Sequence, residues 1–302
     1  NLDSIFIEGL VSLGTSGSCL IRKQNRFYKD SLAFMGAYKL CMKNLIQPDF
    51  INKERAQNGE LEKYKLLIIP YGVSVTSELG AALETYVKGG GRIISDGMLG
   101  YFTDEAWGAE ICPAGGLDQV FGLDVKSDYQ VINEENLKDA GHVYENIAKV
   151  TAEHMEVKQG ADVFASFENG RPAAVSNGYG KGKTAYVGTL FFANAMWNYS
   201  EHTNAFFGKL MEEVEYRPAA QISCPGGELV EVRMLYGEQE AFLFVINHEN
   251  KSAEFELAFP CSGYTELRDI TADKTSVLTN DRAVLRLSLE AEEVKVYMLE
   301  RH

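Results

Sequence analysis

Apolar residues in the first two hundred positions follow two spacings: short continuous runs, and runs at three- and four-residue steps. The run at 66–69 is continuous and is closed by Pro70, which is typical of a strand covered on both faces. Apolar residues then recur at helical spacing over 79–87, glycines at 89–91 end this segment, and a second continuous run follows at 92–95. Together these segments predict a β-α-β unit.

A longer helical pattern precedes this unit. Its apolar residues recur at three- and four-residue steps, as in an amphipathic helix. A strand candidate at 5–13 comes before the helix, and a short strand at 50–51 follows it. The apolar stripe of the expected helix consists of Leu32, Met35, Tyr38, Met42 and Leu45.

The pattern loosens between 97 and 162, where the sequence predicts only one short helix, at 117–122. Order returns at 172–177 and 184–190, two apolar runs that flank the turn GYGKGK and predict a hairpin with glycine in the turn. A helix at 202–214 completes this part of the chain. The alternation of strands and helices indicates an α/β domain with a mostly parallel sheet.

The hydrophobic pattern changes after Pro218, where short runs of alternating apolar and polar residues replace the helical spacing. Several such runs within a short length indicate a small antiparallel β-sandwich. We therefore expect two domains, an α/β domain at 1–219 and an all-β domain at 220–302. The runs are LVEVRML, AFLFVIN, AEFELAF, YTELRDI, AVLRLSL and EVKVYML.

The charge of the chain limits the partners that it can bind, and its cysteine content indicates its compartment. Lys and Arg number 29 against 43 Asp and Glu, a net charge of -14, which repels phosphate backbones and anionic membranes. No apolar run is long enough for a membrane helix. We therefore expect no nucleic-acid or membrane partner.

The 5 cysteines are scattered without C-x-x-C spacing, which argues against a disulfide framework or zinc site and favours a reducing, cytoplasmic compartment. Because the chain begins at Asn1 rather than methionine, we expect that a preceding segment was removed.

Two motifs suggest chemistry that their context does not support. The segment NGYGKGKT at 177–184 ends like a phosphate-binding loop, but Asn177 stands where that loop needs glycine, and a strand rather than a helix follows. The turn SDGMLG after the strand at 92–95 lies where a glutamine amidotransferase carries its cysteine nucleophile, yet it holds Met98, and no histidine precedes His142. The five histidines also lack metal-ligand spacing. We expect no metal, cofactor or catalytic residue in this chain.

Carboxylates and aromatic residues around the loosely patterned region are the candidate ligand or interface residues. Asp96 ends a predicted parallel strand, where open α/β sheets bind ligands. A glycosidase needs two carboxylates that face the sugar, whereas adjacent residues such as Asp104 and Glu105 point in different directions. We interpret these carboxylates as loop-structuring or interface groups. The aromatic residues are interpreted as core, protein interface or sugar-stacking groups, and they form two clusters: Tyr101, Phe102 and Trp107, and Phe191, Phe192, Trp197 and Tyr199.

Four long stretches carry a resemblance to a known family. They read NRFYKDSLAFMGAYKLCMKNLIQPDF, YKLLIIP followed by SELGAALETYVKGGGRIISDG, TDEAWGAEICPAGGLDQVFGLDV, and PAAVSNGYGKGKTAYVGT. In order and spacing, over roughly 25–190, they resemble the trimerisation domain of glycoside hydrolase family 42 β-galactosidases. The terminal β-region looks like the small β-domain that closes those enzymes, whereas 5–25 matches poorly.

The resemblance implies a flavodoxin-like or amidotransferase-like three-layer fold that has lost amidotransferase chemistry. Members of this family carry their catalytic glutamates on a (β/α)8 barrel, which these 302 residues do not contain. The leading hypothesis is therefore a non-catalytic portion of a β-galactosidase-like enzyme that forms homotrimers and supports the barrel, with a galactoside bound by the parent enzyme. A free-standing carbohydrate- or small-molecule-binding module is the alternative, and a self-sufficient enzyme of another type is a third.

Overall fold

A computed structural model describes residues 2–7, 27–103, 108–126, 130–218, 221–223 and 230–301 of the 302-residue chain. Contacts divide the chain into two compact units. The first unit comprises Asn1–Leu40 and Pro48–Arg217, and the second comprises Cys41–Gln47 and Pro218–His302.

A nine-stranded sheet forms the centre of the first unit, in the order β2-β1-β3-β4-β11-β10-β9-β6-β7. The first five strands in this order are parallel, and the remaining pairings are antiparallel. The sheet is therefore mixed, and the expectation of a mostly parallel sheet is correct only for its first half. The parallel strands are β2 (Pro48–Ile51), β1 (Leu2–Ile7), β3 (Tyr64–Ile69), β4 (Arg92–Asp96) and β11 (Gly182–Val187).

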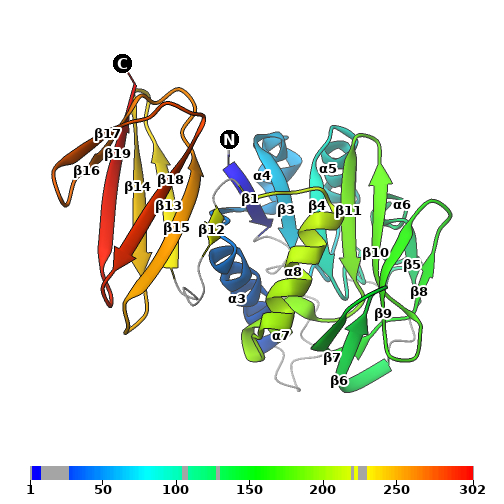
Figure 1. The fold of residues 1–302 in the computed structure, drawn as a ribbon. Coiled ribbons are helices and arrows are strands. Elements are labelled where there is room, and N and C mark those ends of the chain that lie inside the picture. Colours follow the sequence, from blue (N-terminus) through cyan, green and yellow to red (C-terminus); the bar gives the residue numbers. More distant parts are fainter. Residues whose placement is uncertain are drawn as a thin grey trace. The chain divides into compact units, whose positions relative to one another are not determined.

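Helices cover both faces of this sheet (Figure 1). One face carries α4 (Lys53–Gln57), α5 (Ser77–Lys88) and α6 (Leu117–Phe121), and the 3-10 helix η2 (Glu60–Lys63) lies between α4 and β3 in the chain. The other face carries α3 (Phe27–Lys43), α7 (Phe191–Trp197) and α8 (Glu201–Glu213). The helices at 117–122 and 202–214 and the β3-α5-β4 unit that the sequence predicts are confirmed. Thr76 caps α5, because its hydroxyl accepts a hydrogen bond from the Leu79 N–H at 3.2 Å.

The apolar stripe expected on α3 coincides with its buried face only at Leu32, which is 8% exposed. Met35 is 50% exposed, whereas Ala33, Ala37, Leu40 and Cys41 are fully buried. Small residues form the packed face because α7 approaches α3 very closely: a Cβ on Gly36 would lie 1.9 Å from the Phe192 carbonyl oxygen. Leu45 packs against the core of the second unit, to which 41–47 belongs.

The loosely patterned region supplies three strands of the antiparallel half of the sheet, β6, β7 and β9, and a separate two-stranded sheet of β5 and β8. Register shifts between β6 and β7 and the positive φ angles of Asn146 and Val150 interrupt the alternation of apolar and polar residues in these strands. The sequence pattern therefore did not predict them. The first strand, expected at 5–13, occupies Leu2–Ile7, and 8–13 lie outside the described residues. The unpredicted strands are β5 (Leu123–Val125), β6 (Gln130–Lys138), β7 (Val143–Ala152), β8 (Met155–Val157) and β9 (Asp162–Ser166). Strand β9 continues the sheet into the confirmed hairpin of β10 (Pro172–Tyr179) and β11.

Two antiparallel sheets form the second unit, as the alternating runs predict. Inward-facing residues of both sheets share one core, which includes Val232, Leu243, Leu257 and Leu289. The three-stranded sheet contains β12 (Gln221–Ser223), β15 (Ala253–Pro260) and β18 (Arg282–Leu289). The five-stranded sheet contains β13 (Val230–Tyr236), β14 (Glu240–Asn247), β19 (Val294–Glu300), β16 (Glu266–Asp269) and β17 (Lys274–Val277).

Candidate functional site

Asp96, the candidate at the end of β4, is completely buried. Its Oδ1 accepts a hydrogen bond from the Tyr71 N–H at 2.7 Å, and its Oδ2 accepts one from the Phe192 N–H at 2.9 Å. Tyr71 follows β3, and Phe192 lies in the first turn of α7. The Asp96 carboxyl group therefore joins the ends of two separate segments to β4, which agrees with the loop-structuring interpretation.

Glu153, which the sequence did not single out, is a second completely buried carboxylate, placed directly after β7. Its Oε1 accepts hydrogen bonds from the Met98 N–H and the Tyr101 hydroxyl, both at 2.8 Å. Its Oε2 accepts one from the Tyr186 hydroxyl at 2.6 Å. One side chain thus fixes the turn after β4 and connects it to β11.

Burial controls the protonation of both groups. Burial raises the pKa of Asp96 to about 8, and the nearby charge of Glu153 adds to this rise, although the Tyr71 and Phe192 N–H groups oppose it. Burial also raises the pKa of Glu153, against the opposing effect of the hydroxyl groups of Tyr186 and Tyr101. Burial therefore favours the proton-bound form of both carboxyl groups, which limits the charge buried at this end of the sheet.

The buried carboxyl cluster, defined as Asp96 and Glu153, is hydrogen-bonded to surrounding residues of the protein. Neither carboxyl group has exposed surface, and all four oxygens accept hydrogen bonds from the protein. Burial raises the pKa of the neighbouring Cys112 thiol to about 11, with a smaller contribution from Glu153, so this thiol is a poor nucleophile. Met98, with a φ of 71°, has no ionisable group to offer.

The remaining predicted site residues are spread over different environments. Tyr101 and Phe102 are partly exposed; Tyr101 contacts Glu153, while the Phe102 N–H donates to the Val73 carbonyl at 2.9 Å. Asp104, Glu105 and Trp107 lie outside the described residues. The structure thus brings Asp96 and Tyr101 to the buried carboxyl cluster, and a ligand or interface role for the predicted residues stays a prediction.

The second aromatic cluster is divided between core and surface. Phe191 and Phe192 are completely buried, as the core interpretation requires. Trp197 is 40% exposed, and Tyr199 is partly exposed. Only the last two residues of this cluster are therefore available for contacts with another molecule.

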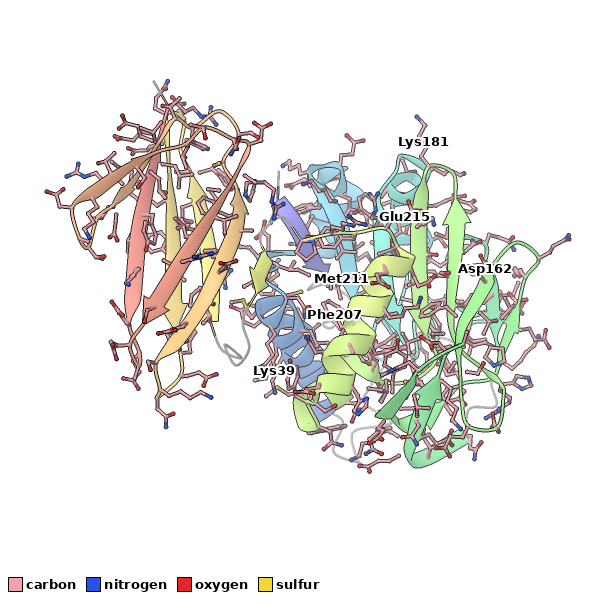
Figure 2. The ribbon with its side chains drawn as sticks, viewed as in Figure 1. Lys39, Asp162, Lys181, Phe207, Met211 and Glu215 are labelled. Carbon is pink, nitrogen blue, oxygen red and sulfur yellow. The ribbon has the colours of Figure 1, made fainter. Side chains whose placement is uncertain are left out.

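The motif NGYGKGKT forms the β10-β11 hairpin rather than a phosphate-binding loop. Gly180 supplies a positive φ of 64° in its turn, and Lys181 stands at its tip (Figure 2). The Lys183 ammonium group lies 2.8 Å from the Glu215 carboxylate. Among the described residues, no group of three or more His, Cys, Asp or Glu side chains is placed to hold a metal ion.

None of the helices in the described parts of the chain has both the length and the apolar character needed to cross a bilayer.

Comparisons with known proteins agree on one group of relatives. A family model described as "Beta-galactosidase trimerisation domain" matches residues 24–216. β-Galactosidase Pbg of Clostridium perfringens is 23% identical over 278 residues, which cover 86% of this chain and 35% of that protein. β-Galactosidase GalA of Bacillus licheniformis is 23% identical over 273 residues, which cover 85% of this chain and 36% of that protein. The chain thus spans about a third of the length of these relatives.

Solved structures with the same fold include further glycoside hydrolases. Gan42B, a GH42 β-galactosidase from G. stearothermophilus, aligns with a TM-score of 0.75 at 20% identity, over 100% of this chain and 40% of that chain. The β-galactosidase of Bacillus circulans sp. alkalophilus gives a TM-score of 0.71 at 19% identity, over 99% of this chain and 41% of that chain. α-L-Fucosidase isoenzyme 2 of Paenibacillus thiaminolyticus gives a TM-score of 0.71 at 12% identity, over 100% of this chain and 49% of that chain. These likenesses show the fold of the chain.

Proposed function

Because the chain belongs to the family of β-galactosidase trimerisation domains, we propose that it assembles three copies of itself and thereby supports a glycoside hydrolase of the β-galactosidase type. The observation that carries this proposal is the match of that family's model to 24–216, which covers most of the first unit. In this proposal 1–219 form the trimerisation domain and 220–302 form an accessory β-sandwich.

The buried carboxyl cluster supports a non-catalytic role for this domain. Asp96 lies at the carboxyl end of a parallel strand, where an α/β fold would place a ligand, yet its oxygens and those of Glu153 are occupied by protein donors. Asp96 therefore gives no support to the alternative of a free-standing carbohydrate-binding module. The chemistry of the parent enzyme, and its galactoside, belong to residues outside this chain.

The proposal includes an amidotransferase-like origin for the first domain. Two features support it: the parallel half of the sheet carries helices on both faces, and the turn after β4 holds Met98 at a φ of 71°. A strained turn after a central strand is the usual seat of a nucleophile in such folds. Methionine at this position leaves the turn without a nucleophile.

Sedimentation velocity of the purified chain, combined with an assay on a chromogenic galactoside, tests the proposal. We expect a species of three times the 33.5 kDa chain mass and no hydrolysis. A chain that stays monomeric as its concentration is raised would contradict the assembly role. Hydrolysis that co-purifies with the chain would contradict the non-catalytic role.

A further inference from the structure

The middle of helix α3, at 32–42, is apolar on nearly every side although Met35 is exposed, and the other charged residues of the helix, Lys29, Asp30 and Lys43, lie in its end turns. Positions 32–42 contain a single charged residue, Lys39. The face formed by Ala33, Ala37 and Leu40 is completely buried, whereas Met35 on another face is 50% exposed. A helix that is apolar all round is normally buried all round. The composition of α3 therefore indicates that its outer face is covered by another surface.

The exposed Met35 of α3 and the partly exposed residues around it are referred to together as the α3 patch. Helical spacing places Phe34 beside Tyr38 and Met35 beside Lys39. The Phe50 ring, in β2, stacks on Phe34 with a centroid distance of 5.2 Å and on Tyr38 at 6.2 Å, and it is 37% exposed. The Lys39 ammonium group lies 4.7 Å from the centroid of the Tyr199 ring. The α3 patch consists of Phe34, Met35, Tyr38, Lys39, Phe50 and Tyr199.

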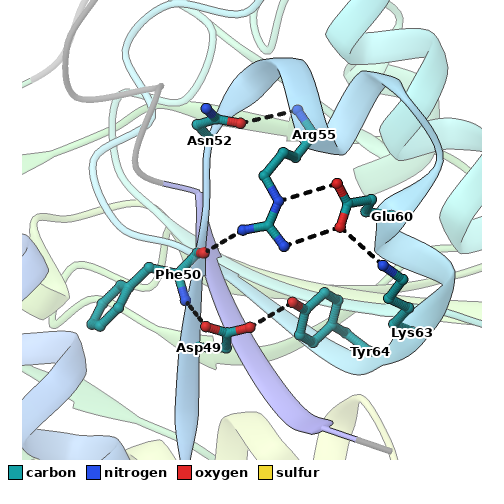
Figure 3. Close-up of polar contacts among 7 residues, drawn as sticks. All are labelled: Asp49, Phe50, Asn52, Arg55, Glu60, Lys63 and Tyr64. Atoms are coloured by element: carbon teal, nitrogen blue, oxygen red, sulfur yellow. Dashed lines mark hydrogen bonds and ion pairs between the residues drawn. The ribbon is translucent and has the colours of Figure 1, made fainter.

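Polar contacts hold the β2 side of this patch in place (Figure 3). The Phe50 N–H donates to Asp49 Oδ1 at 2.8 Å, and its carbonyl oxygen accepts from the Arg55 guanidinium at 3.3 Å. That guanidinium also binds both carboxylate oxygens of Glu60, at 3.1 and 3.0 Å. On the inner side of α3, close packing at Gly36 leaves the helix no room to move toward α7. A rigid apolar surface loses little conformational entropy when it binds a partner.

Charge favours a second copy of this chain as the partner. Lys39 projects from α3 in Figure 2, and burial lowers its pKa without an opposing contribution from a carboxylate. Among the described residues, no carboxylate forms an ion pair with Lys39. The chain carries a net charge of -14, so the surface of another copy is rich in the carboxylates that this ammonium group lacks. An ion pair across an interface would complement the apolar contacts of the patch.

We propose that the α3 patch is the surface through which one copy of the chain docks onto the next in the trimer. This inference rests on the proposed trimerisation function. A closed ring of three copies uses head-to-tail contacts, so the patch of each copy meets a different, acidic surface of its neighbour. The aromatic rings and Met35 supply the buried apolar contact, and Lys39 pairs with a carboxylate of the neighbouring copy.

Light scattering on the wild-type chain and three variants tests this inference. Met35→Glu places a charge in the apolar contact, and we expect the mass to fall threefold to the 33.5 kDa of one chain. Met35→Leu keeps an apolar side chain of similar volume and should leave the trimer intact. Val131→Glu, at a valine that is 75% exposed on β6, introduces the same charge outside the patch and should also leave it intact. Circular dichroism on each variant confirms that the fold is retained.

The outcomes distinguish a failure of the α3 patch as the interface from a failure of the trimerisation function. Folded Met35→Glu protein that remains a trimer overturns the α3 patch as the interface and leaves the trimerisation function standing. Equal loss of mass in Met35→Glu and Val131→Glu also overturns it, because the effect would then come from added charge anywhere on the surface. A monomeric wild-type chain overturns the trimerisation function itself.

Discussion

The buried carboxyl cluster and the α3 patch reverse the usual distribution of polar and apolar groups. At the cluster, two ionisable side chains, Asp96 and Glu153, have no exposed surface. At the patch, Met35 and Phe50 are 50% and 37% exposed. Both arrangements cost free energy unless a partner compensates for them.

The two regions differ in where the compensation lies. Every carboxylate oxygen of the cluster accepts a hydrogen bond from within the same domain, so its groups stabilise the fold of a single chain. No comparable cover for Met35 exists within the described parts of the chain, and the compensation is proposed to come from another copy. Substitutions in the cluster should therefore change folding stability, whereas substitutions at the patch should change assembly.

The largest expected effect is on folding stability, from Glu153→Leu. This substitution leaves the buried hydroxyl group of Tyr186, and the partly buried hydroxyl group of Tyr101 and N–H of Met98, without this acceptor. Since an unsatisfied buried group costs about 1 to 3 kcal/mol and water can reach the partly buried ones, we expect a loss of about 3 kcal/mol in the free energy of unfolding. Urea denaturation measures this loss. Glu153→Gln is the milder control, because it keeps one acceptor oxygen. A loss smaller than that of a typical surface substitution would show that the cluster does not stabilise the fold.

The next effect is a dependence of stability on pH. The pKa of Asp96 is about 8 in the folded protein, against a usual value of 3.8. Between these values the folded state binds the additional proton, so the free energy of unfolding falls as pH rises, by up to about 1.4 kcal/mol per pH unit. The raised pKa of Glu153 acts in the same direction. The melting temperature should decrease from pH 5 to pH 8, and the decrease should be smaller in Asp96→Asn. An equal decrease in this variant would show that other groups cause the pH dependence.

A smaller effect on stability is expected at the inner side of the α3 patch. In Gly36→Ala the new Cβ would lie 1.9 Å from the Phe192 carbonyl oxygen, so α3 must shift away from α7, at a cost of about 1 to 3 kcal/mol. Gly208→Ala on α8 is the matched control, because no atom lies within 4 Å of its new Cβ, and it should stabilise the protein by about 1 kcal/mol. Thermal unfolding of both variants measures the difference. Equal melting temperatures would contradict the close packing of α3 on α7.

How far the fold could be predicted depended on the regularity of each segment. The β3-α5-β4 unit was predictable because its buried strands and its helix carry uninterrupted patterns that Pro70 and Gly89 terminate. Strands β6 and β7 were not, since their bulges break the alternation that marks a strand. On α3 the rule that large apolar residues are buried holds for Leu40 but fails for Met35, because the close contact at Gly36 places small residues on the packed face.

The candidate site was only partly predictable for a different reason. Asp96 could be singled out because a strand end is a recognisable place in the sequence. Glu153 could not, because its donors Met98, Tyr101 and Tyr186 come from segments that meet only in the folded sheet. No local spacing relates these positions, so no sequence pattern predicts the contact.

Zero-length carbodiimide cross-linking of a mixture of isotopically light and heavy chains tests the proposed assembly most directly. The reagent joins an ammonium group to a carboxylate in contact with it, and mass spectrometry of the mixture distinguishes links between copies from links within one copy. We predict a mixed light-heavy link from Lys39 to an Asp or Glu of the neighbouring copy, lost in Met35→Glu. Trimeric protein whose mixed links all join other residues, with Lys39 unlinked, would contradict the assignment of the α3 patch as the interface.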